Sequence, residues 1–184
     1  MNKKIEWKKI ITKNEYHADE VISALQKEIR RGKMENAIFW ARELCLSGKK
    51  YENKFWERMI TIAAEDIGIA NPNASILICC LKQAYYSEFE NSDDRLLQAL
   101  FATGYLARSK KDRFIDEIKN YFNLFPQKKK IPNYALDKHT KKGKEQKRGD
   151  VHFWRIATKI IPESKNRNKK YLKSIIKFLN ESRK

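Results

Sequence analysis

The sequence contains few cysteines and no long apolar run, and both scarcities exclude classes of protein. Its three cysteines, Cys45, Cys79 and Cys80, form no CxxC pair, so we expect neither a disulfide framework nor a zinc knuckle. The longest nearly apolar stretch, residues 74–81, is far shorter than the roughly 20 residues that cross a bilayer. We expect no signal peptide. The protein is predicted to be cytoplasmic, with Cys79 and Cys80 buried in its core.

The glycines are too widely spaced for a nucleotide-binding loop. Such a loop needs closely spaced glycines, because its backbone N–H groups must approach the phosphates. The six glycines stand at positions 32, 48, 68, 104, 143 and 149. The only Gly-Lys dipeptide, Gly143-Lys144, lacks the earlier glycine that the motif requires. We therefore expect no ATP site of this type, no cofactor and no enzymatic activity.

Apolar residues recur at three-to-four spacing between the few glycines and prolines, which is typical of helices. The pattern predicts an all-α protein, an array or bundle of about eight to nine helices. The expected helices cover residues 18–31, 34–47, 51–67, 72–87 (capped by Asn71), a segment capped by residues 92–94, and residues 110–125, 135–140, 151–161 and 169–182. Residues 143–149 are predicted to form a loop.

Charge and proline content divide the chain into four parts. We expect an N-terminal arm (1–16), a helical core (17–125), a basic linker (126–150) and basic C-terminal helices packed on the core (151–184). Residues 1–127 carry 21 basic and 18 acidic side chains, whereas the remaining residues carry 19 and 5. Codon bias toward Lys does not explain this asymmetry. A concentrated positive field favours a polyanionic partner, most often nucleic acid.

The candidate nucleic-acid site lies in residues 128–148, where nine basic side chains oppose two acidic ones. Lys and Arg neutralise phosphates, and a tyrosine offers a ring on which an unpaired base stacks. The candidate residues are Lys128, Lys129, Lys130, Tyr134, Lys138, His139, Lys141, Lys142, Lys144, Lys147 and Arg148. We favour nucleic-acid contact, assisted by the basic tail 165–184, over a solvated loop without a partner.

Two adjacent carboxylates, Glu65 and Asp66, stand just before a predicted helix end, where the helix dipole disfavours negative charge. Charges in such a position need partners. We expect a structural ion-pair network with Arg30, Arg42 and Arg58 rather than acid–base catalysis, because no nucleophile or metal ligand is evident nearby.

A weaker alternative for the basic segment is a metal-dependent nuclease that uses Asp137, His139 and Asp150. A hydrolytic metal centre needs at least three convergent ligands. The spacing of these three residues does not itself bring them together, so we assign no metal site.

Three ordered blocks of sequence resemble one known family: VISALQKEIR (21–30), AIFWAR (37–42) and IAAEDIGIANP (62–72). Together they resemble the C-terminal helical domain of the replication-associated recombination protein A (MgsA) family of AAA+ ATPases, which are related to the Werner-helicase-interacting protein. The resemblance covers roughly residues 17–110. The lysine-rich segment 128–148 departs from the usual end of that domain.

The resemblance implies a fold like the clamp-loader C-terminal domain, which in the family follows an AAA+ ATPase module and forms tetramers. Those proteins act at stalled replication forks, bind DNA ends and single-strand junctions, and associate with single-stranded-DNA-binding protein. The ATPase module is missing from this sequence, so ATP hydrolysis does not carry over, and the start at Met1 suggests a stand-alone relative or an excised piece.

We therefore expect a non-catalytic, oligomerising DNA-binding protein, associated with the nucleoid and linked to replication, repair or recombination. Its expected partners are single-stranded or forked DNA and further copies of the chain. The alternative is a protein–protein module that docks an AAA+ ATPase or a single-stranded-DNA-binding protein without touching nucleic acid, with the lysines serving solubility.

Overall fold

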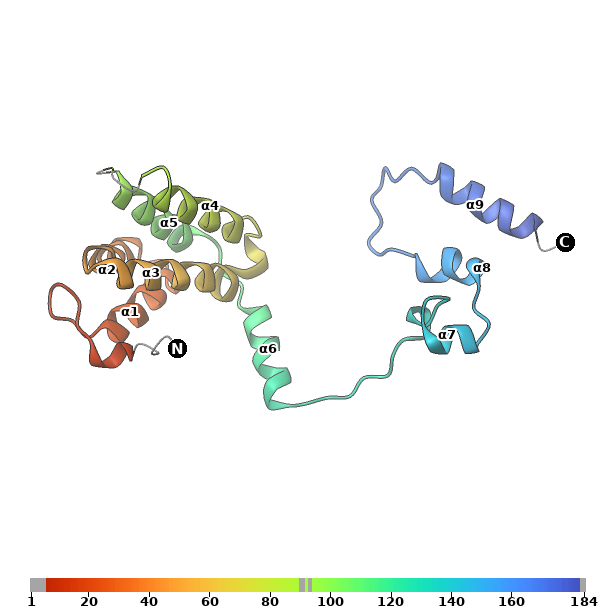
Figure 1. Cartoon of the computed structure of the whole chain (residues 1–184), viewed down its shortest axis with the longest axis horizontal. Helices are drawn as coiled ribbons and strands as arrows, with labels where there is room; N and C mark the ends of the chain where they lie inside the picture. The colour runs from red at the N-terminus through yellow and green to blue at the C-terminus, as the bar shows by residue number, and fades with distance from the viewer. Residues whose placement is uncertain (1–5, 90–91, 93, 183–184) are drawn as a thin grey trace. The chain divides into compact units, whose positions relative to one another are not determined.

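The computed structural model describes residues 6–89, 92 and 94–182, which form two compact units, residues 1–126 and 127–184. Within the described ranges the regular elements are helical, and the only strand-like contact is an isolated pairing of Ile11 with His17 (Figure 1). Nine α-helices lie in these ranges. The prediction of an all-α protein with eight to nine helices is confirmed. None of the described helices has the length and apolar character that crossing a membrane requires.

The first unit begins with a short 3-10 turn, η1 (Trp7–Lys9), and three helices, α1 (Ala18–Arg30), α2 (Met34–Leu46) and α3 (Lys49–Ile62). Helix α3 continues into a π-helical turn, η2 (Ala63–Ile67), and a 3-10 turn, η3 (Gly68–Ala70). Three further helices follow, α4 (Ala74–Tyr86), α5 (Arg95–Arg108) and α6 (Phe114–Leu124).

The core of this unit is built by the apolar faces that the three-to-four spacing predicts. Helix α2 packs between α1 and α5, and α3 supplies the large buried side chains Phe55, Trp56 and Met59. Helix α6 packs only at its start, against η2 and η3, and extends from the α1–α5 body (Figure 1). No described residue of α6 is buried.

Two predictions about α4 are wrong. The helix begins at Ala74 rather than at Pro72, because the residues before it form a turn. Cys79 and Cys80 are exposed rather than buried, since α4 turns Ala74 and Ile78 toward the core and leaves its other face in solvent. Helical spacing identified an apolar segment there but not which of its faces is covered.

The second unit contains a 3-10 turn, η4 (Asn133–Ala135), the short helices α7 (Lys141–Glu145) and α8 (Asp150–His152), a π-helical turn, η5 (Phe153–Ala157), and α9 (Lys170–Glu181). Helix α9 packs on α8 and η5. None of the described apolar side chains in this unit is fully buried.

The helix predicted over residues 135–140 is wrong, and the loop predicted over residues 143–149 is correct only for residues 146–149. Helix α7 occupies residues 141–145 instead, because Thr140 caps it: the Thr140 hydroxyl accepts a hydrogen bond of 3.0 Å from the backbone N–H of Gly143. The helix predicted over residues 151–161 is shorter than expected: it consists of α8 and the π-helical turn η5, which ends at Ala157. That residues 151–184 pack on the core stays a prediction.

Candidate functional site

The basic segment folds around a glycine at the centre of α7. A Cβ on Gly143 would lie 1.8 Å from the carbonyl oxygen of Asp137, so only glycine fits this position. The Thr140 hydroxyl donates to the same carbonyl at 3.0 Å, and the Asp137 carboxylate accepts the backbone N–H of His139 at 2.9 Å. The segment from Asp137 to Gly143 is therefore a closed turn with defined geometry.

Arg148 holds this turn to the chain before it. Its guanidinium donates to the carbonyl oxygen of Leu136 at 2.7 Å and to both the carbonyl and side-chain oxygens of Asn133. Its backbone N–H donates to the carbonyl of Gly143 at 2.9 Å. Because these contacts use both ends of the guanidinium, Arg148 has a structural role in the described conformation.

Lys138 and His139 are also engaged within the second unit. Lys138 forms an ion pair with Asp150, and its Nζ lies 4.8 Å from the centre of the Phe153 ring. The His139 ring packs edge-on against the same Phe153, with 5.1 Å between ring centres. These two side chains thus join the α7 turn to α8 and η5.

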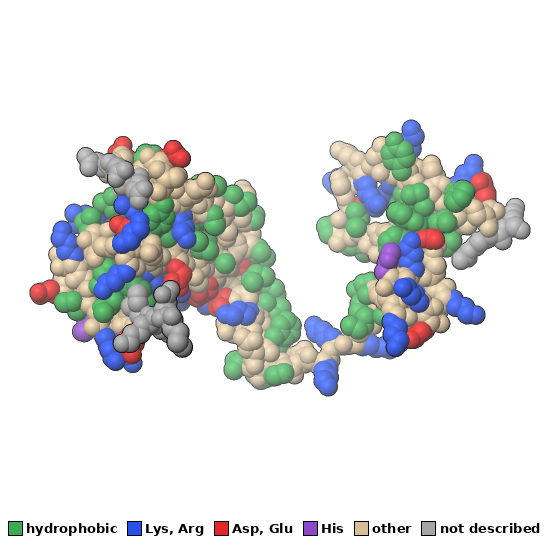
Figure 2. Space-filling view, in the orientation of Figure 1, with side chains coloured by type: hydrophobic (Ala, Val, Ile, Leu, Met, Phe, Trp, Pro, Cys, Tyr) green, Lys and Arg blue, Asp and Glu red, His purple; other side chains and the backbone are tan. Residues whose placement is uncertain are grey.

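The other predicted residues of this site are exposed. Lys141, Lys142, Lys144 and Lys147 surround α7, and none of them forms an ion pair with another described residue. We call these four residues the α7 lysine cluster. Tyr134 is 62% exposed, and Lys128, Lys129 and Lys130 lie exposed in the extended segment before it. Figure 2 shows Lys and Arg side chains gathered along this part of the chain.

The three residues of the nuclease alternative do not form a metal site. Asp150 is paired with Lys138, and the Asp137 carboxylate is turned onto the backbone of His139. Among the described residues, no group of three or more His, Cys, Asp or Glu side chains is placed to hold a metal ion.

The carboxylate network lies in the first unit, centred on the fully buried Asp66 in η2. Asp66 Oδ1 accepts hydrogen bonds of 2.6 Å from Arg30 Nε and from Arg113 Nη1, and its Oδ2 accepts one of 3.0 Å from Gln26. Glu65 Oε1 accepts from the same three side chains at 3.0 to 3.2 Å. The network ties α1 and η2 to the start of α6.

The three arginines predicted to pair with Glu65 and Asp66 differ in how they contact these carboxylates. Arg30 contacts both carboxylates directly, whereas Arg58 reaches them only through the side-chain oxygen of Gln26. Arg42 is exposed on α2 and forms no ion pair with any other described residue. A buried carboxylate such as Asp66 needs direct ion pairs and hydrogen bonds. Arg42 makes neither with Glu65 or Asp66.

Sequence reasoning missed Arg113, the second direct partner. Partial burial opposes its charge, but the hydrogen bond and negative charge of Asp66 raise the pKa of Arg113 above its usual value. Arg113 precedes the first residue of α6, where the helix dipole disfavours a cation. A cation at the start of a helix is unfavourable, and this position is the one signal in the sequence that Arg113 has a carboxylate partner.

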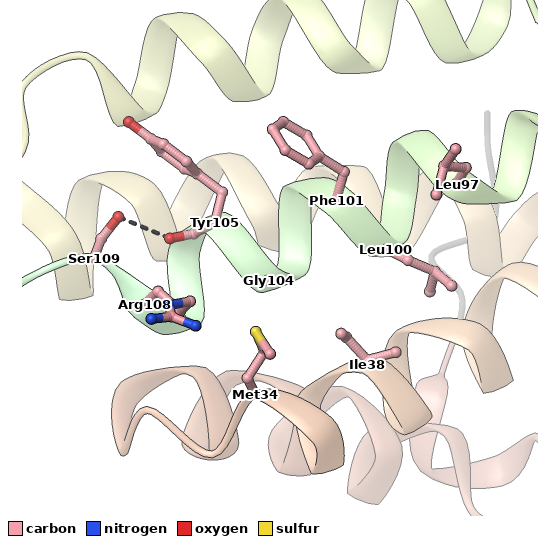
Figure 3. A pocket seen from close by; sticks show the side chains of 9 residues that line it. All are labelled: Met34, Ile38, Leu97, Leu100, Phe101, Gly104, Tyr105, Arg108 and Ser109. Carbon is pink, nitrogen blue, oxygen red and sulfur yellow. Dashed lines mark hydrogen bonds between the residues drawn. The ribbon is translucent and has the colours of Figure 1, made fainter.

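A second feature that the sequence did not reveal is an apolar groove of about 600 Å³ between α2 and α5. Met34 and Ile38 project from α2, opposite Leu100 of α5, and Gly104 leaves α5 without a side chain facing Met34 (Figure 3). The only charged side chain that lines the groove is Arg108. We call this feature the α2–α5 groove.

The described residues thus form a helical protein whose first unit has an apolar core and a groove and whose second unit has a basic cluster. The family model described as the MgsA AAA+ ATPase C terminal matches residues 32–171 of the 184. The chain therefore belongs to the MgsA AAA+ ATPase C-terminal family. A comparison with curated proteins gave no significant match.

The family match differs in extent from the predicted resemblance, which covered residues 17–110. It begins at residue 32, after α1, and continues through the α7 lysine cluster into α9. The expectation that segment 128–148 departs from the family domain is therefore wrong.

Proposed function

We propose that this chain is a self-associating helical module of a replication-linked AAA+ system and that its second unit contacts nucleic acid through the α7 lysine cluster. The observation that carries the proposal is the exposure of these four lysines without ion-pair partners among the described residues. Lysines that are not neutralised by neighbouring carboxylates are available to phosphates, and each phosphate contact releases a condensed counterion.

Tyr134 adds a preference for unpaired strands. Its ring is 62% exposed and precedes the cluster in the same folded segment, which Arg148 clasps through Asn133. Every base has a face that stacks on an aromatic ring, and such stacking does not require a particular sequence. We therefore propose single-stranded or forked DNA as the ligand, in the cytoplasm and at the nucleoid.

The module has no catalytic role of its own in this proposal. Family membership links it to an AAA+ ATPase, and we propose that the ATPase supplies the hydrolysis while this domain supplies assembly and strand contact. A single-stranded-DNA-binding protein is a second candidate partner. The processes that fit these partners are replication, repair and recombination.

The test is the affinity of three proteins for fluorescent single-stranded and forked DNA, measured by anisotropy. They are the wild type, a cluster variant with Lys141, Lys142, Lys144 and Lys147 changed to Ala, and a control variant with Lys8, Lys13, Lys50 and Lys119 changed to Ala. The control lysines are exposed in the first unit, and both variants lose four positive charges.

We expect the cluster variant to bind at least about tenfold more weakly and the control to stay within about twofold of the wild type. Equal losses in the two variants would show that net charge alone matters. No measurable binding by the wild type would overturn the proposal.

A second candidate function is docking of a protein without nucleic-acid contact, which the α2–α5 groove favours. An apolar groove between two helices is the form that receives an amphipathic helix. If docking alone is the function, the cluster variant will keep its oligomeric state and its protein partners, and the wild type will not bind DNA at all.

A further inference from the structure

The α2–α5 groove exposes apolar side chains that the other described elements of the first unit leave uncovered. Leu97 is 58% exposed and Phe101 is 54% exposed along its length. The groove ends at Arg108, whose guanidinium makes no ion pair with a described residue. The groove is therefore an apolar channel with one cation at its end.

Helix α6 complements this groove, because it exposes apolar side chains and carries acidic residues in its first turn. Phe114, Ile115 and Ile118 fall on one face of the helix, and Phe125 directly follows its last residue. Phe114, Ile115 and Phe125 are about half exposed. Figure 2 shows hydrophobic side chains along the helix. Its first turn is acidic, with Asp116 bound to Arg113 and with Glu117 free of any ion pair in the described part of the chain.

Both α6 and the α2–α5 groove leave apolar area uncovered. A fully exposed aromatic or large aliphatic side chain presents about 200 Å², so the three half-exposed ones leave roughly 300 Å² uncovered along α6 and at its end. The half-exposed Leu97 and Phe101 leave roughly 200 Å² uncovered at the groove. Contiguous apolar surfaces of a few hundred Å² mark sites of protein association.

A chain cannot place its own α6 in its own groove without breaking the carboxylate network. Arg113, directly before α6, is bound to Asp66 in η2, and the backbone N–H of Asp112 donates to the carbonyl of Asp66 at 3.0 Å. The carbonyl of Asp112 also lies against Gly68, where a Cβ would come within 2.2 Å. These contacts fix the start of α6 at η2, so an α6 helix that occupies the groove must come from another copy of the chain.

The dimensions and charges of the two surfaces match. Helix α6 has 11 residues and is about 16 Å long, and the groove runs from Leu97 to Arg108 over a similar length of α5. With the N-terminal end of α6 at the Arg108 end of the groove, the unpaired Glu117 carboxylate meets the unpaired Arg108 guanidinium. Opposite charges at the rim select the orientation.

We propose that the α2–α5 groove of one copy receives helix α6 of a second copy. The inference rests on the proposed self-association and adds its interface. Because the groove and α6 are different surfaces, the contact is heterologous, and each copy has one donor face and one acceptor face. Repetition of such a contact closes into a ring or continues as a chain.

Two variants separate the two halves of this contact. Phe101→Asp places a charge in the groove and leaves α6 intact, whereas Phe114→Asp places a charge on α6 and leaves the groove intact. Both side chains are more than half exposed, and an acidic residue suits the first turn of α6, so the fold is kept. Ile76→Asp on α4 is the matched control, because Ile76 is 65% exposed and lies outside both surfaces.

The measurement is sedimentation velocity of the full chain, whose monomer mass is 21.9 kDa. We expect the wild type and Ile76→Asp to sediment as oligomers, and each of the other two variants to associate at least about tenfold more weakly. An equimolar mixture of Phe101→Asp and Phe114→Asp should form a 1:1 dimer and nothing larger, because one intact groove and one intact α6 remain between them.

Other outcomes would distinguish failure of the α6–groove interface from failure of the proposed self-association. A mixture that stays monomeric, or single variants that assemble like the wild type, would overturn the interface and leave self-association standing. A monomeric wild type would overturn both, while the DNA measurement would be unaffected. As a second check, Arg108→Glu and Glu117→Arg should each weaken assembly, and the two together in one chain should restore it.

Discussion

Arg113 Nη1 donates a 2.6 Å hydrogen bond to Asp66 Oδ1, joining the start of α6 to a buried carboxylate in η2. The same Asp66 atom accepts Arg30 Nε from α1. One carboxylate oxygen therefore sets the position of α6 relative to the core. It does so through two guanidinium groups that are themselves partly exposed.

Replacing Asp66 with Asn is expected to destabilise the first unit. The change leaves Arg30 and Arg113 facing a neutral amide. Glu65 remains as an anion for both, and Asp116 for Arg113 alone. We expect a loss of about 2 to 3 kcal/mol in the free energy of unfolding. Urea denaturation followed by circular dichroism measures it. Asp19→Asn, an exposed acid in the first turn of α1, is the control and should cost well under about 1 kcal/mol. Equal effects of the two changes would contradict a special role for Asp66.

The two glycines of the second unit should respond very differently to alanine. Gly143→Ala forces a Cβ into the carbonyl of Asp137, whereas a Cβ on Gly149 has no neighbour within 4 Å. We expect Gly143→Ala to open the α7 turn and expose the Arg148 amide, which donates to the carbonyl of residue 143. Amide hydrogen exchange should show lost protection there and little change in Gly149→Ala. Retained protection in Gly143→Ala would mean that the turn has another conformation.

The three cysteines should separate into one inert and two reactive thiols. Burial, together with the nearby Glu52 carboxylate, raises the pKa of Cys45 to about 12, whereas Cys79 and Cys80 are exposed. Only the thiolate reacts with thiol reagents. A thiol-exchange assay on the folded protein should count two fast groups, and a third only after addition of denaturant. Three fast groups would contradict the burial of Cys45.

Stability should fall in acid through Glu43. Burial raises the pKa of this carboxyl, but the nearby Thr12 hydroxyl, the two hydrogen bonds from Asn14 and the charge of Arg42 together outweigh that effect and hold the pKa below its usual value. Because the folded pKa is the lower one, Glu43 stabilises the fold above its unfolded pKa, and that contribution is lost as the pH falls through the folded value.

Glu43→Gln should therefore cost about 1 to 2 kcal/mol at pH 7 and flatten the decline of unfolding free energy below about pH 5. Denaturation midpoints measured between pH 3 and pH 7 provide the comparison. Glu57→Gln, at an exposed site on α3, is the control. An unchanged pH profile in Glu43→Gln would assign the acid sensitivity to other groups.

Helical spacing predicted much of the first unit for a simple reason. In α1, Val21, Leu25 and Ile29 recur at intervals that place them on one face, and all three are buried. The same reasoning failed for Cys79 and Cys80, since α4 is apolar on more than one side and only tertiary packing decides which side is covered. The periodicity of apolar residues therefore predicts where a helix lies in the sequence more reliably than which of its faces other helices cover.

At the candidate sites, the sequence predicted which residue types are present but not which contacts they make. Composition identified a run of cations, but it could not distinguish Arg148, which binds backbone carbonyls, from Lys144, which is exposed. Nor could it bring Arg113 to Asp66, because these residues are 47 positions apart and are brought together by helix packing rather than by a local sequence pattern. The α2–α5 groove had only one trace in the sequence, a glycine in mid-helix at position 104.

The salt dependence of binding to single-stranded DNA tests the role of the α7 lysine cluster most directly. Each phosphate contact contributes about 0.7 to the slope of log affinity against log salt concentration. If all four lysines bind phosphates, the slope for the cluster variant should be smaller than that of the wild type by about 3. A wild-type slope that the four substitutions leave unchanged would contradict the proposed contact.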